Sequence, residues 1–169
     1  MKAVKTIYFA GPDIFMPDYE GHMARIKDLC AASGLTPLLP GELELCAGES
    51  APIADDIFRL NLSLIKKADI IIANLVPFRG PVEPDSGTVF ECGYGYASGK
   101  AVIGVVPDQR DLATRLGADD APQNHGGRFL LDGSWVEDYG QPVNLMLACC
   151  FTAMAATVEE AIAVAARLE

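Results

Sequence analysis

The segment DIIIANLV, residues 69–76, is the stretch that decides the fold of this chain. After one aspartate it is apolar throughout, a pattern typical of a strand that is covered on both faces of a parallel sheet. Three more β-rich apolar runs are expected to be strands: Val4–Ala10, Leu35–Leu39 and Ala101–Val106. Pro142–Met154 is also apolar and is expected to form either a strand or a short helix.

Apolar residues at helical spacing occupy the segments around these runs. The predicted helices are Tyr19–Ser33, Ala54–Ala68, Thr88–Ser98 and Val158–Leu168. Strands alternating with helices imply right-handed crossovers. We therefore expect an α/β fold in a single domain over residues 1–169, with a flavodoxin-like or Rossmann-like parallel sheet of four to five strands flanked by helices. Residues 107–141 are polar, rich in glycine and aspartate, and are expected to be mostly loop.

The composition narrows the classes of partner. The chain has 13 lysines and arginines against 23 aspartates and glutamates, a net charge of −10, which argues against binding to nucleic acid or to an anionic membrane. No apolar run reaches the roughly 20 residues of a transmembrane helix, and the N-terminal apolar run is better explained as a strand than as a signal peptide. The five cysteines make no metal-binding spacing with the two histidines, so we expect reduced thiols, no metal and a cytoplasmic location.

One carboxylate stands in an apolar context. Glu91 lies within PDSGTVFECGYG, residues 84–95. If Asp85 or Ser86 caps the helix that follows, the positive end of that helix would keep Glu91 ionised in a partly dry site. Such a carboxylate suits nucleophilic attack on an anomeric carbon. The alternative is that Asp85 is only an N-cap and Glu91 only a surface residue of an amphipathic helix.

Other motifs have plainer explanations. GYGYASGK, residues 93–100, has neither the spacing nor the position of a phosphate-binding loop. His22 is expected on a helix surface and His125 in a glycine-rich loop, neither with a partner that suggests a nucleophilic triad. Cys92 is expected to be a packing residue.

Four blocks together resemble the nucleoside 2-deoxyribosyltransferases, a superfamily that includes 2′-deoxynucleoside 5′-phosphate N-hydrolases. They are TIYFAGPDIF at 6–15, IKKADIIIANLVPFRGPVEPDSGTVFECGYGYASGK at 65–100, AVIGVV at 101–106 and YGQPVNLML at 139–147. The resemblance implies an enzyme, a pentosyltransferase of nucleotide salvage, which exchanges purine or pyrimidine bases on 2′-deoxyribonucleosides without a cofactor. Whether both base classes are accepted stays open.

The resemblance also implies roles for individual residues. Glu91 aligns with a nucleophile that forms a covalent deoxyribosyl intermediate with net retention, Asp85 with an aspartate that orients the sugar hydroxyls, and Tyr8 with a tyrosine that positions the nucleophile. The remaining substrate-binding candidates are Gly11, Asp13, Phe15, Asn61, Ser86, Gly87, Asn144 and Met146. Asn144 and Met146 align with residues that a neighbouring subunit lends, Asn144 binding the 5′-hydroxyl end, which implies a homo-oligomer of at least two chains.

One position departs from the family pattern. Some members have an aspartate, a candidate proton donor to the base, where this chain has Asn61, and an amide cannot act as a general acid. Asp13, Glu42, Glu44 and Asp85 are the remaining candidates. Two other functions stay open: a hydrolase of deoxynucleoside 5′-monophosphates, with water in place of the acceptor base, and a non-catalytic nucleoside-sensing module.

Overall fold

The computed structural model describes residues 4–40, 54–124, 126–130 and 132–168. Its centre is a five-stranded sheet in the order β2-β1-β3-β4-β8, and every neighbouring pair is parallel. The strands are β1 (Thr6–Ala10), β2 (Thr36–Leu38), β3 (Ile70–Asn74), β4 (Ala101–Val105) and β8 (Ala153–Ala155). All five residues of β3 are buried, because this strand lies in the middle of the sheet with helices on both faces.

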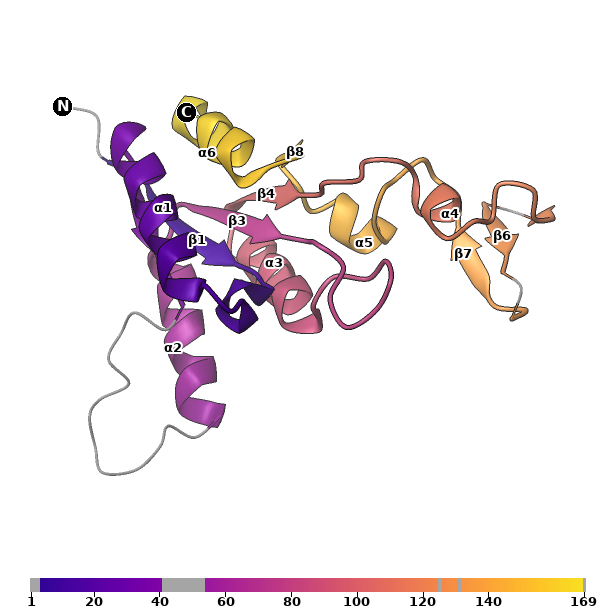
Figure 1. The fold of residues 1–169 in the computed structure, drawn as a ribbon, viewed down its shortest axis with the longest axis horizontal. Coiled ribbons are helices and arrows are strands. Elements are labelled where there is room, and N and C mark those ends of the chain that lie inside the picture. Colours follow the sequence, from indigo (N-terminus) through magenta and orange to yellow (C-terminus); the bar gives the residue numbers. More distant parts are fainter. Residues whose placement is uncertain (1–3, 41–53, 125, 131, 169) are drawn as a thin grey trace.

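Helices cover both faces of the sheet (Figure 1). Two apolar clusters show which helices lie on which face. Because side chains alternate along a strand, Ile7 and Phe9 of β1 face one cluster, while Tyr8 and Ala10 face the other. The first cluster is closed by α1 (Tyr19–Ala32) and α6 (Val158–Arg167), and the second by α2 (Ala54–Lys67), α3 (Ser86–Ala97) and α5 (Leu145–Ala148).

The observed elements follow local signals in the sequence. Asp18, Asp85 and Thr157 cap α1, α3 and α6, each accepting a hydrogen bond from a backbone N–H of the first turn. The α/β class and the parallel sheet are confirmed. Both of the elements considered for residues 142–154 are present: the short helix α5 lies within this segment, and the edge strand β8 begins at its end, at Ala153.

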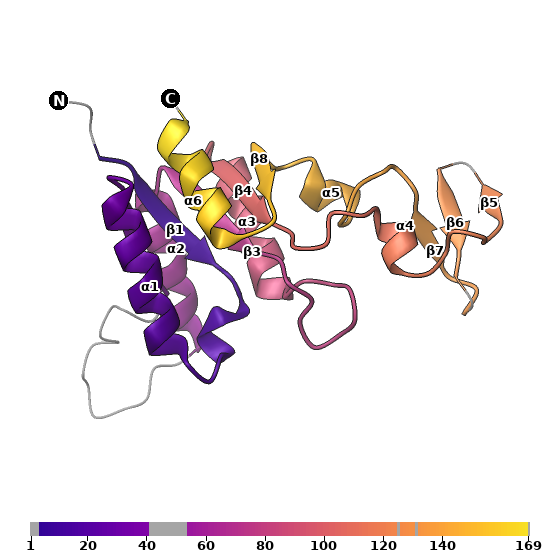
Figure 2. The same ribbon diagram turned by 45° about the horizontal axis from the view of Figure 1, so that its top comes forward.

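Residues 107–141, here called the arm, are mostly loop, as expected. They also contain elements that were not predicted: the short helix α4 (Leu112–Arg115) and an antiparallel sheet of β5 (Gln123–Asn124), β6 (Gly127–Phe129) and β7 (Trp135–Glu137). Strands of two or three residues are too short to show an alternating pattern in the sequence. The arm extends away from the main sheet (Figures 1 and 2).

A small apolar cluster of its own holds the arm together. Its buried members are Val82, from the loop after β3, and Leu112, Ala113, Ala118 and Val136 of the arm. No helix in the described part of the chain is long and apolar enough to cross a membrane.

Candidate active site

Glu91 and Tyr8 meet on the face of the sheet that α2 and α3 cover. Tyr8 is at the middle of β1 and is fully buried, and its hydroxyl donates a hydrogen bond of 2.6 Å to Oε1 of Glu91. Asn61 of α2 places its Nδ2 3.5 Å from the same oxygen, at the outer limit of a hydrogen bond. Three elements distant in sequence thus converge on one carboxylate.

The electrostatics of Glu91 differ from what the sequence suggested. Burial raises the pKa of this carboxyl to about 7; the hydrogen bond from Tyr8 acts in the opposite direction, and the nearby charge of Asp85 adds to the rise. The expected ionisation by the helix start was wrong, because α3 begins at Ser86 and Glu91 lies beyond its first turn, where the dipole has little effect. Burial and the Glu91 carboxylate together raise the pKa of Tyr8, so its hydroxyl stays a proton donor.

Asp85 is the N-cap of α3. Its Oδ2 accepts hydrogen bonds from the backbone N–H of Thr88 at 3.0 Å and from the Thr88 hydroxyl at 3.2 Å. Ser86 and Gly87 follow in the first turn and are exposed. The capping role considered for Asp85 is therefore confirmed, and the same carboxylate also acts electrostatically on Glu91.

The turn after β1 carries Asp13 and Phe15. A Cβ at Gly11 would lie 2.2 Å from Oδ2 of Asp13 and 2.9 Å from Cβ of Asn74, so a side chain there would displace the Asp13 carboxylate. Oδ1 of Asp13 accepts a 3.0 Å hydrogen bond from Nδ2 of Asn74 and lies 2.9 Å from Nε2 of His22. His22 lies on helix α1, as expected, and is half-buried beside this carboxylate.

Phe15 belongs to an aromatic group that also contains Phe78. The two rings are stacked, with 5.4 Å between their centroids. The Cζ atom of the Arg79 guanidinium lies 5.3 Å from the centroid of Phe15 and 4.6 Å from that of Phe78. Phe15 is 61% exposed, so most of its surface is open to a ligand. Arg79 has a φ of 57°, unusual for a residue with a side chain, and no sequence pattern pointed to its involvement.

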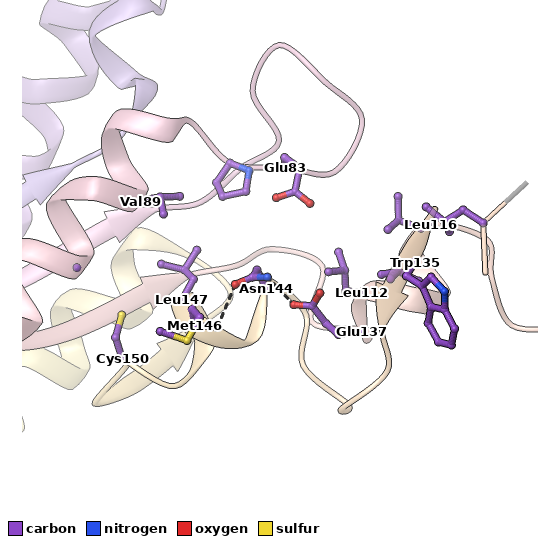
Figure 3. Close-up of a pocket in the computed structure, with 14 residues that line it drawn as sticks. Glu83, Val89, Leu112, Leu116, Trp135, Glu137, Asn144, Met146, Leu147 and Cys150 are labelled. Atoms are coloured by element: carbon purple, nitrogen blue, oxygen red, sulfur yellow. Dashed lines mark hydrogen bonds between the residues drawn. The ribbon is translucent and has the colours of Figure 1, made fainter. Parts of the chain in front are cut away.

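Asn144 and Met146 lie elsewhere. Asn144 caps α5, Met146 is 76% exposed, and both line a cavity of about 650 Å³ between the core and the arm (Figure 3). From α3 this cavity takes Val89 and Gly93, which helical spacing places on a different side of the helix from Glu91. The structure of one chain therefore does not bring Asn144 to Glu91.

Two of the proposed proton donors, Glu42 and Glu44, and also His125, lie outside the described residues. Cys92 is fully buried, as expected of a packing residue. Within the described ranges, no group of three histidine, cysteine, aspartate or glutamate side chains could hold a metal ion.

The parallel sheet with helices on both faces defines a Rossmann-like α/β protein, and the half-buried carboxylate of Glu91, hydrogen-bonded by Tyr8, is its candidate active site. A family model described as nucleoside 2-deoxyribosyltransferase matches residues 7–146. The chain belongs to the nucleoside 2-deoxyribosyltransferase family, a family of pentosyltransferases.

Individual proteins are similar to this chain in sequence or in structure. The 2-desoxiribosyltransferase from Leishmania mexicana has a similar structure, with a TM-score of 0.79 and 35% identity over 96% of this chain and 97% of that one. The 2-deoxyribosyltransferase from Bacillus psychrosaccharolyticus shares the fold, with a TM-score of 0.61 and 20% identity over 97% and 92% of the two chains. An uncharacterized protein of Schizosaccharomyces pombe is 32% identical over 110 residues, or 63% of this chain and 52% of that relative, so the match spans about half of its length.

Proposed function

We propose that this protein exchanges nucleobases on 2′-deoxyribonucleosides, with residues 1–169 acting as one nucleoside 2-deoxyribosyltransferase-like domain. The observation that carries the proposal is the 2.6 Å hydrogen bond from Tyr8 to Oε1 of Glu91. Through this bond one fixed donor orients the Glu91 carboxylate, which is partly removed from water. Both residues lie in the segment that the family model matches. Orientation by a fixed neighbour is what a nucleophilic side chain needs.

In the proposed reaction Glu91 attacks C1′ of the deoxyribose, the C1′–N bond breaks, and the base leaves. The deoxyribosyl ester on Glu91 is then attacked at C1′ by a nitrogen of the second base, which regenerates the carboxylate. Two inversions give net retention, as in retaining glycosidases. With a pKa of about 7, Glu91 is about half ionised at neutral pH, and only the ionised fraction reacts.

Proton delivery to the leaving base is assigned to an aspartate. Asn61 lies near Oε1 of Glu91 but carries no acidic proton. Of the candidates in the described residues, Oδ2 of Asp85 is engaged as a helix cap, whereas Asp13 uses only Oδ1 in its contacts with Asn74 and His22 and keeps Oδ2 free of hydrogen bonds to described residues. We favour Asp13 for this reason.

The sugar pocket is completed by a second chain. In one chain Asn144 lines the same cavity as Val89 and Gly93, which lie on another side of α3 from Glu91, and Met146 is 76% exposed. A neighbouring copy that covers this region would gain Asn144 and Met146 at its own Glu91. We therefore propose a homo-oligomer of at least two chains.

The test of this reaction is a mechanism-based label. A 2′-fluoro-2′-deoxynucleoside should leave its sugar attached to Glu91, because the fluorine destabilises the oxocarbenium-like transition state that releases it. Peptide mass spectrometry locates the adduct, and a label on another residue would overturn the assignment of Glu91.

A parallel incubation with deoxyinosine and free adenine separates the alternatives. Transfer predicts deoxyadenosine, detected by chromatography. Release of hypoxanthine without a new nucleoside would favour the hydrolase, and no change would favour the sensing module.

A further inference from the structure

Glu137 of β7 reaches across from the arm to the start of α5. Its Oε1 accepts a 2.7 Å hydrogen bond from Nδ2 of Asn144 and a 2.8 Å hydrogen bond from the backbone N–H of Leu145. Oδ1 of Asn144 in turn accepts a 3.0 Å hydrogen bond from the backbone N–H of Met146. These contacts hold both ends of the Asn144 amide, and Figure 3 shows the carboxylate and the amide facing each other in the cavity.

The Asn144 amide still has hydrogen-bonding positions that these contacts do not use. An asparagine side chain has two N–H donors and an oxygen with two lone pairs. Glu137 uses one donor and Met146 uses one lone pair, so one donor and one acceptor remain on the exposed side chain. A hydroxyl group, which both donates and accepts, matches this pair.

A phosphate group does not match it. Phosphate oxygens need donors and positive charge, commonly from arginine or lysine. Neither residue type occurs among the described residues that line the cavity, whereas two carboxylates, Glu83 and Glu137, do. A phosphate bound to Asn144 would lie close to the Glu137 carboxylate, and two negative charges that close together repel each other.

We propose that Glu137 is a specificity-determining residue, which fixes Asn144 to bind the 5′-hydroxyl of a nucleoside and whose charge rejects a nucleoside 5′-monophosphate. The inference rests on the proposed function, because it takes Asn144 as the residue at the 5′ end of the sugar. It deepens that function by assigning a residue outside the quoted family blocks to the choice between nucleoside and nucleotide.

The experiment is calorimetric binding of deoxyinosine and of its 5′-monophosphate to the full-length Glu91→Gln protein, in which neither ligand is turned over. This parent should bind the nucleoside at least about tenfold more tightly than the monophosphate, and Glu137→Gln, added to it, should reduce that ratio by about tenfold, because the acceptor oxygen stays while the charge is removed. Glu137→Ala should weaken nucleoside binding itself. The matched control is Glu83→Gln, which removes a charge from the same cavity without a contact to Asn144 and should leave the ratio close to that of the parent.

The outcomes separate the proposed role of Glu137 from the proposed transfer reaction. An unchanged ratio in Glu137→Gln, or an equal change in Glu83→Gln, would overturn the role of Glu137 even if the wild-type protein exchanges bases. Nucleoside binding with the expected ratios, but no base exchange by the wild-type protein, would overturn the transfer reaction and leave the selectivity intact. If the parent binds neither ligand, both fail. Thermal unfolding of each variant shows whether the arm is still folded.

Discussion

The face of the sheet around Glu91 and the arm around Glu137 are built in opposite ways. Tyr8 and Glu91 come from a regular strand and a regular helix, and their neighbours belong to a large buried cluster. Glu137 comes from a strand of three residues, and the apolar cluster under the arm is small. In this fold the residues proposed for the chemical step come from long, regular elements, while the residue proposed for selectivity comes from a short strand.

This difference has an energetic side. A residue packed into a large cluster moves only when much of the sheet is disrupted, whereas a small cluster can open locally at lower free energy. Glu91 and Tyr8 are therefore expected to move little, which suits the proposed role of Glu91 as a nucleophile. The apolar cluster under the arm can open without disrupting the sheet. Opening of the arm should therefore weaken the binding of substrate more than it slows the chemical step.

The largest expected effect is that of Glu91→Gln. Replacing the carboxylate with an amide of the same shape removes the proposed nucleophile, and base exchange should fall by about 10⁴-fold or more. The reaction of deoxyinosine with adenine, followed by chromatography, measures the loss. The melting temperature serves as the control, and a variant with more than a tenth of wild-type activity would be incompatible with covalent catalysis at this position.

The same variant should change how stability depends on pH. The pKa of Glu91 in the folded protein, about 7, lies above its ordinary 4.5, so between these values the folded state binds more protons than the unfolded state. The contribution of Glu91 to the free energy of unfolding is therefore fully present below pH 4.5 and is lost as the pH rises through 7. The loss is about 3 kcal/mol at most. Urea unfolding at several pH values should show Glu91→Gln gaining stability relative to the wild type as the pH rises, and parallel curves would contradict the raised pKa.

The next effect is that of Tyr8→Phe, which removes the only hydroxyl that donates a short hydrogen bond to Glu91 among the described residues. Losing that donor should raise the pKa of Glu91 further, because the hydrogen bond favours the ionised form. We expect kcat/KM at neutral pH to fall by about 30-fold and the rising limb of its pH profile to move to higher pH. A uniform loss at every pH would instead indicate a packing role for the tyrosine.

The elements around Glu91 were largely predictable from the sequence, whereas the short helix and strands of the arm were not. The apolar run at 69–76 and the spacing of apolar residues before Lys67 led directly to β3 and α2. Asp85 was predictable as a cap from its place before Ser86 and Gly87. The pKa of Glu91 was not, because it depends on how completely tertiary packing excludes water, and local sequence carries no measure of that.

The contacts of the arm could not be read from the sequence for a different reason. Glu137 and Asn144 are seven residues apart in a stretch without periodicity, and their hydrogen bond depends on a turn between β7 and α5. The position of Arg79 over Phe15 and Phe78 was also not predictable, because it requires a backbone conformation that arginine rarely adopts. Long-range geometry in irregular segments has no local signature.

The smallest expected effect comes from a pair of valine-to-alanine variants that compares the two regions directly. Val136, in the arm, and Val102, in β4, are both buried, at 3% and 0% exposed. Val136→Ala should loosen the arm and raise the KM for deoxyinosine by about fivefold while kcat stays near wild type, because the arm holds the partner of Asn144 and no reacting group. Val102→Ala makes the same chemical change in the sheet and should lower the melting temperature without raising KM. Equal effects of the two substitutions on KM would mean that the arm and the sheet unfold as one unit, and the division between rigid chemistry and adjustable selectivity would then be wrong.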